Sequence, residues 1–170
     1  MNANEIKKLA TRCSAHLQRE EAVLQETLRI VEETREGLLA RDGERLERSV
    51  TEQQKTFEAA EAIRVRREAM RKEIAALLDL TLEKATITRL AEKSPIAVGN
   101  ELRNSRTRLS KLVARVRTMH RTNAVLAIQT NRIVANALHK LIGLDMENAS
   151  YAKNGKQPLP AAPAVVDTDT

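Results

Sequence analysis

Hydrophobic residues recur every three, four or seven positions along most of this chain, the spacing of helices that bury one stripe. The stripe predicts a first helix over 4–40 and a second over 44–80. Arg41-Asp42-Gly43 separates them, and so short a connection makes the two helices antiparallel. The stripe of the second helix includes Leu46, Val50, Phe57, Met70 and Ile74.

Two further helices are predicted after residue 80. A short one covers 82–93, with Thr81 as its N-cap. Ser94-Pro95 has the arrangement of an N-cap followed by proline at the first helical position, which starts a last helix over 95–142. If it is unbroken near Gly99, this helix is about 72 Å long at about 1.5 Å per residue. Its heptad places these residues against the first two helices: Leu126, Ile133, Val134, Ala137 and Leu141.

The fold class expected from these patterns is all-α: an elongated antiparallel helical bundle or coiled coil of three long helices and one short helix. None of the nine Gly and Pro residues falls between positions 44 and 94, which favours long uninterrupted helices. From residue 148 the composition shifts to Pro, Ala and polar residues without periodicity. We therefore expect a helical domain over 1–147 and a flexible, disordered Pro/Ala-rich tail over 148–170.

The second half of the last helix has apolar residues on almost every side, and a helix that is apolar all round must be buried all round. One helical hairpin cannot cover it. Either the short helix or a homodimer partner covers the outward side, or that side binds an amphipathic segment of another protein. The outward apolar residues are Ala124, Val125, Ile128, Ala135, Leu138 and Ile142.

The net charge of +6 is concentrated near the same helix, because residues 94–147 hold nine Lys/Arg against three acids. These bases either form a solvated face that pairs with glutamates of the first two helices, or attract an acidic partner. Nucleic acid is a disfavoured partner, since the bases lie on many helical faces and no aromatics interleave with them. The basic patch consists of Arg103, Arg106, Arg108, Lys111, Arg115, Arg117 and Arg121.

No enzyme is indicated, because no nucleophile, base and orienting group can be proposed together. Cys13 and His16 are three apart, but two ligands without a second pair make a poor zinc site, so neither a metal nor a cofactor is expected. The single cysteine excludes an intrachain disulfide. No signal peptide and no apolar run of about 18 to 20 residues is present, which predicts a soluble cytoplasmic protein without membrane insertion.

Three short stretches and the helix layout resemble one known family. The stretches are Arg41-Asp42-Gly43-Glu44-Arg45-Leu46, Met119-His120-Arg121-Thr122-Asn123-Ala124-Val125-Leu126 and Tyr151-Ala152-Lys153-Asn154-Gly155. Together with the long first helix they look like the FlgN-type flagellar export chaperones. The resemblance covers roughly residues 5–156.

The resemblance implies a bacterial cytoplasmic chaperone. Such proteins bind the C-terminal helical segments of hook-filament junction (hook-associated) proteins, prevent premature assembly and deliver them to the flagellar type III export gate. By position, Asn123 to Ile142 would hold the client, and Tyr151 would lie in the region associated with gate docking. Two alternatives stay open: a structural homodimeric coiled-coil adaptor, and a basic helical protein that binds nucleic acid. Which client is bound, and whether the chain is a monomer or a homodimer, cannot be read from the sequence.

Overall fold

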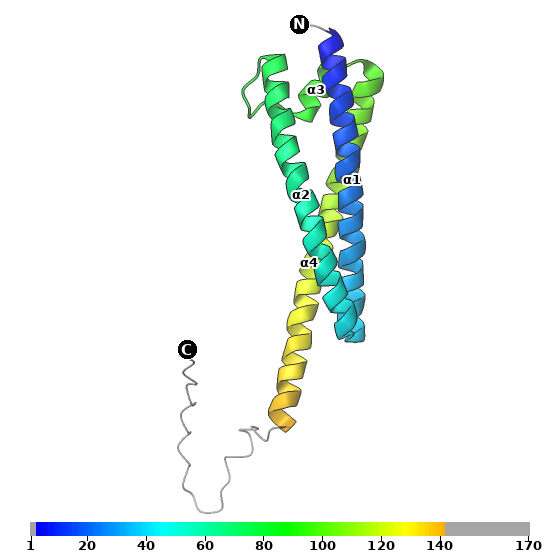
Figure 1. Cartoon of the computed structure of the whole chain (residues 1–170), viewed down its shortest axis with the longest axis vertical. Coiled ribbons are helices and arrows are strands. Elements are labelled where there is room, and N and C mark those ends of the chain that lie inside the picture. The colour runs from blue at the N-terminus through cyan, green and yellow to red at the C-terminus, as the bar shows by residue number, and fades with distance from the viewer. Residues whose placement is uncertain (1–2, 142–170) are drawn as a thin grey trace, which may run out of the picture. The chain divides into compact units, whose positions relative to one another are not determined.

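The computed structural model describes residues 3–141. They form four helices: α1 (Ala3–Ala40), α2 (Gly43–Leu78), α3 (Ile87–Lys93) and α4 (Ile96–Leu141) (Figure 1). The predicted all-α fold class is confirmed, and the described residues contain no strand. The chain forms two compact units, Met1–Gln129 and Thr130–Thr170, so the end of α4 belongs to the second. The predicted tail over 148–170 and the predicted boundary before it lie outside the described residues.

The turn between α1 and α2 forms where the sequence predicts it. Asp42 caps α2, and its side chain accepts a hydrogen bond from the Arg45 amide at 3.0 Å. Arg41 takes up the reversal with a left-handed backbone (φ 55°). A Cβ at Gly37 would lie 3.0 Å from the Leu46 side chain, so the two helices approach closely beside the turn.

Ion pairs and hydrogen bonds give the helix directions within the first unit. Arg12 pairs with Glu73, whereas Arg29 pairs with Glu52, so α1 and α2 run antiparallel as predicted. In the contacts between α1 and α4, residue numbers increase in the same direction along both helices. Three contacts show this: Ser14 donates to Glu101 at 2.8 Å, Arg108 to Glu21 at 3.0 Å, and Arg115 to Glu32 at 2.7 Å. Helices α1 and α4 are therefore parallel.

Helix α3 is shorter than predicted, and the choice of Thr81 as its N-cap is wrong. The helix begins at Ile87, and the Thr86 side chain accepts from the Arg89 amide at 3.3 Å. Asp79 ends α2 in a left-handed conformation. The Thr81 carbonyl then accepts from the amides of Lys84 and Ala85 in a turn. A helix of under two turns has too little periodicity for its start to be placed by spacing.

Helix α4 is continuous through Gly99, whereas the sequence left open whether the helix is broken near this residue. It begins one residue after Pro95, whose carbonyl accepts the Gly99 amide at 2.9 Å. A Cβ at position 99 would lie 2.5 Å from the carbonyl oxygen of Ala91. Glycine therefore allows the first turn of α4 to approach the end of α3, where a larger residue would push the two helices apart.

The main core of the first unit lies where the N-terminal half of α1 meets the end of α2, α3 and the start of α4 (Figure 1). Leu90 of α3 and Leu102 of α4 are completely buried there. Cys13 is also fully buried. The other core residues are Ile6, Leu9, Ala10, Leu17, Met70, Ile74, Ala85, Ala91 and Leu109.

The predicted heptad of α4 is buried only in its first part. Leu102, Ser105, Leu109, Val116 and Asn123 are buried in turn. Every described residue from position 131 onward is exposed. The expectation that Ile133, Val134, Ala137 and Leu141 are buried is therefore wrong, and Leu126 is only half-buried. A heptad pattern predicts which residues share one face of a helix, but it does not predict whether another helix covers that face.

Candidate functional site

Exposed apolar side chains gather in the C-terminal part of α4. In the first unit, Val125 and Ile128 are 55% and 59% exposed, and Ala124 is exposed as well. In the second unit, Leu138 is 49% exposed and Ala135 is exposed. These are five of the residues that the sequence placed on the outward side. Two other predicted site residues, Ile142 and Tyr151, lie outside the described residues.

Asn123 lies in a different environment from these five residues. Its side chain is 7% exposed, and its Nδ2 donates a hydrogen bond to the Val31 carbonyl at 2.8 Å. Its Oδ1 is buried and has no hydrogen-bond partner among the described residues. A single buried asparagine in a helical seam favours one register, because any slip leaves its amide unsatisfied. Asn123 thus joins α4 to α1 and takes no part in the exposed surface.

The basic residues of α4 divide into two groups. Arg108 and Arg115 pair with Glu21 and Glu32 of α1, as one of the two interpretations predicted. Arg103 donates to the Asn100 side chain at 2.7 Å. The others are exposed, and no ion pair or hydrogen bond involves their side chains within residues 3–141. This second group is Arg106, Lys111, Arg117 and Arg121.

Helical geometry places part of the unpaired group beside the exposed apolar residues. Successive residues are about 100° apart around a helix. Arg117 and Arg121 therefore lie on the same side of α4 as Ala124 and Ile128, away from the side that Asn123 presents to α1. Cations and exposed apolar groups thus form one continuous strip within the first unit.

A groove of about 370 Å³ lies next to this strip, between α2 and α4, and sequence reasoning missed it. Val50 and Phe57 line it and are 62% and 67% exposed, so their predicted place in the buried stripe of α2 is wrong. Thr27 of α1 and His120 of α4 also line the groove. The remaining lining residues are Gln53, Gln54, Thr56 and Ala60.

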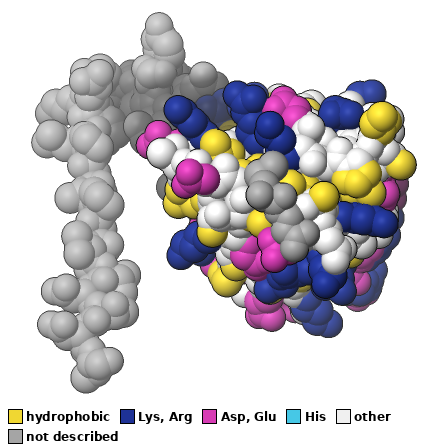
Figure 2. Space-filling model, turned by 90° about the horizontal axis from the view of Figure 1, so that it is seen from above, with side chains coloured by type: hydrophobic (Ala, Val, Ile, Leu, Met, Phe, Trp, Pro, Cys, Tyr) yellow, Lys and Arg dark blue, Asp and Glu magenta, His cyan; other side chains and the backbone are white. Residues whose placement is uncertain are grey.

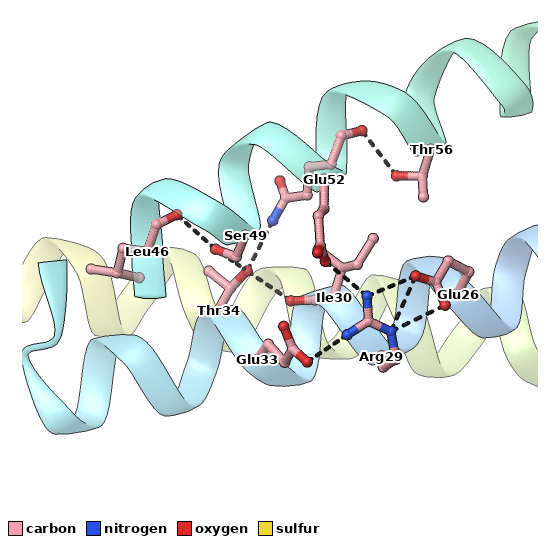
Figure 3. A network of polar contacts seen from close by, with 10 residues as sticks. Glu26, Arg29, Ile30, Glu33, Thr34, Leu46, Ser49, Glu52 and Thr56 are labelled. Atoms are coloured by element: carbon pink, nitrogen blue, oxygen red, sulfur yellow. Dashed lines mark hydrogen bonds and ion pairs between the residues drawn. The ribbon is translucent and has the colours of Figure 1, made fainter. Parts of the chain in front are cut away.

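Polar contacts join α1 and α2 beside the groove. The α1–α2 contact at this level includes a hydrogen-bonded network (Figure 3). Thr34 is its centre: its hydroxyl donates to the Ile30 carbonyl at 2.9 Å and accepts from Gln53 Nε2 at 3.0 Å. Ser49 lies 3.2 Å from the same hydroxyl. Ser49 and Gln53 contact the Thr34 hydroxyl of α1, whereas Val50 and Phe57 are exposed where α2 lines the groove.

Arg29 forms ion pairs with three glutamates beside this network (Figure 3). It contacts Glu26 and Glu52 at 2.7 Å and Glu33 at 2.5 Å. Hydrogen bonds from the guanidinium hold the pKa of Glu26 below its usual value. The bond to Glu52 crosses from α1 to α2, so directional contacts help to set the register of these two helices here.

The candidate metal ligands are buried in the core. Burial raises the pKa of the Cys13 thiol to about 11, which keeps it protonated and unreactive near neutral pH. Burial also lowers the pKa of His16, whose Nε2 is 4.0 Å from a carboxylate oxygen of Glu20. Glu20 in turn forms an ion pair with Arg67. Among residues 3–141, no three potential metal ligands are grouped together.

The end of the molecule seen in Figure 2 shows hydrophobic, basic and acidic side chains interspersed. This face differs from the α4 strip, where bases and apolar residues occur together without acids over 102–141. In the part of the chain that the structure describes, no helix has both the length and the apolar character needed to cross a membrane.

Comparison with known families finds one whose model, described as FlgN protein, matches residues 2–158. The match includes all four helices and both stretches of exposed apolar residues on α4. Comparisons with curated proteins and with solved structures find no match.

Proposed function

We propose that this chain, which belongs to the FlgN family, uses the exposed apolar side of α4 to hold a helical client for flagellar export. Membership of the family supports the general role of a flagellar export chaperone. The observation that carries the proposal is the exposure of Val125 and Ile128 on α4, within the first unit. A patch of this kind is typical of a surface that receives a partner.

The proposed client is the C-terminal helical segment of a hook-filament junction (hook-associated) protein. An amphipathic segment would place its apolar face on Val125 and Ile128, and exposed hydrophobic surface on both partners would leave water. Ordering the segment costs about 2–5 kcal/mol of the gross binding free energy. The resulting affinity is moderate, as suits a carrier that must release its client. In this role the chain is a binding protein and not an enzyme.

We place the complex in the bacterial cytoplasm, before the client enters the type III export apparatus. Covering the apolar face of the client there would prevent premature assembly. Delivery to the export gate would involve the region around Tyr151, which lies outside the described residues.

Co-purification tests the identity of the client. The full chain is produced with each hook-filament junction protein of the same genome, either intact or without its C-terminal helical segment. We expect a complex that survives size-exclusion chromatography with the intact client and none with the shortened one. Equal recovery of both forms, or of neither, would contradict the proposal.

Light scattering of the chain without client measures its mass in solution and so tests the homodimer alternative. A tight dimer that does not exchange for any client would favour the structural adaptor. Binding of nucleic acid would instead weaken steeply with salt, because phosphate contacts release counterions. Binding of a helical client should weaken much less with salt, because its apolar contacts do not depend on counterion release.

A further inference from the structure

Two hydrogen bonds define where the groove between α2 and α4 lies along the helices. Asn123 bonds to the Val31 carbonyl, and Gln53 bonds to Thr34. Residues 31–34 of α1 therefore lie beside residue 53 of α2 and residue 123 of α4. Because α2 runs antiparallel to α1 whereas α4 runs parallel to it, Phe57 lies at the level of α4 residues just before Asn123. His120, which shares the groove with Phe57, confirms this alignment.

The two walls of the groove differ in chemistry. The α2 wall presents Val50 and Phe57, seven residues apart and so about 10 Å apart along one side of the helix. The α4 wall presents His120, flanked in sequence by the unpaired cations Arg117 and Arg121. Among the described residues, no acidic side chain lines the groove. The nearby carboxylate of Glu52 is already bonded to Arg29 at 2.7 Å.

We propose that the groove between α2 and α4 is a second docking wall for the client helix, and that this helix is acidic along one side. Its apolar residues pack on Val50 and Phe57, and its carboxylates lie beside Arg117 and Arg121. The client then continues along α4 onto Ala124 and Ile128, which are on the same side of the helix. This inference rests on the proposed function and adds the charge of the client to it.

Charge complementarity favours such a client over a second copy of this chain. Residues 94–147 hold nine bases against three acids, so two copies that met through this wall would bring cations together. Nucleic acid would satisfy the arginines but would leave the apolar α2 wall unused. An acidic amphipathic helix would contact both walls and would cover Phe57, an aromatic residue of the kind enriched at the centres of protein interfaces.

Two synthetic helical peptides with the same leucine stripe test the inference, one flanked by glutamates and the other by lysines. Binding of each to the full chain is measured by fluorescence anisotropy. We expect the glutamate peptide to bind at least about tenfold more tightly, with a difference that shrinks as salt rises. Phe57→Ser, and the double variant Arg117→Glu with Arg121→Glu, should each weaken its binding about tenfold or more.

Matched controls separate local effects from general ones. Val65→Ser removes another exposed apolar side chain of α2 outside the groove, and Lys7→Glu with Lys8→Glu makes the same change of net charge on α1. Both controls should bind the glutamate peptide within about twofold of the unchanged chain. Because the substituted side chains are exposed, circular dichroism and the thermal midpoint should not change.

Three results would overturn the inference. They are equal binding of the two peptides, tight binding by Phe57→Ser, and a fall from dimer to monomer mass in Phe57→Ser, which would assign the groove to a second copy. Capture of the hook-associated client by two variants distinguishes failure of the groove inference from failure of the proposed function. If Ile128→Asp abolishes its capture while Phe57→Ser does not, the α4 surface stands and the groove is not used. If neither substitution affects capture, both proposals fail.

Discussion

Ile128→Asp is expected to weaken binding of the client segment about 30-fold or more, which corresponds to about 2 kcal/mol or more. Ile128 is 59% exposed in the free chain, so an aspartate there remains hydrated and costs the fold little. In the complex the same carboxylate would be buried against apolar groups without a partner. Isothermal titration of the purified client segment measures the loss, and Leu138→Asp should act in the same direction.

Two controls make this result specific to the surface. Val65→Asp places the same charge at a comparably exposed apolar position of α2 and should leave binding unchanged. Ile128→Leu keeps an apolar side chain of the same size and should retain most of the affinity. Helix content by circular dichroism should match that of the unchanged chain in all three variants. Full affinity in Ile128→Asp would remove this residue from the client surface.

Leu102→Ala is expected to lower the free energy of unfolding by about 2–5 kcal/mol, whereas Ile133→Ala should change it by less than about 0.5 kcal/mol. Both residues belong to the same predicted heptad stripe. Leu102 is completely buried, and its truncation leaves a cavity in the main core. Ile133 is 52% exposed, so its truncation leaves no enclosed cavity.

Urea denaturation followed by circular dichroism measures the two changes side by side. The comparison tests whether α4 supplies stability through its first part and an accessible surface through its last. A loss for Ile133→Ala close to that for Leu102→Ala would show that the end of α4 is packed in solution. The surface proposed for the client would then be occupied already.

Helix positions could be predicted because hydrophobic spacing and capping residues are local signals. The turn at Asp42 and the start of α4 beside Pro95 both lie where the sequence indicates. The predicted start of α3 was wrong because Thr81 and Thr86 are both suitable N-caps. The turn between them, which depends on tertiary contacts, decides which residue caps the helix. The sequence left open whether the outward residues are covered, and in the structure Ala124, Val125, Ile128, Ala135 and Leu138 are exposed.

Burial on the neighbouring helix could not be predicted from spacing alone. Val50, Gln53 and Phe57 all belong to the predicted helical stripe, yet Val50 and Phe57 are exposed and only Gln53 bonds to Thr34 of α1. Ser49, outside the predicted stripe, also contacts Thr34. A polar contact of this kind has no hydrophobic periodicity to reveal it. Asn123 is a similar case, because its position in the heptad was visible but its bond to the Val31 carbonyl was not. The unpaired state of Arg117 and Arg121 likewise depends on where the glutamates of α1 lie.

Hydrogen–deuterium exchange of the free chain and of its complex with the client segment tests the central claim most directly. The account predicts that backbone amides over 124–141 exchange more slowly in the complex, because a bound helix shields this part of α4 and suppresses its opening. Amides in the main core around Leu102 should change little, since they are already protected. Unchanged exchange over 124–141 in a complex whose formation is verified by mass would contradict the account.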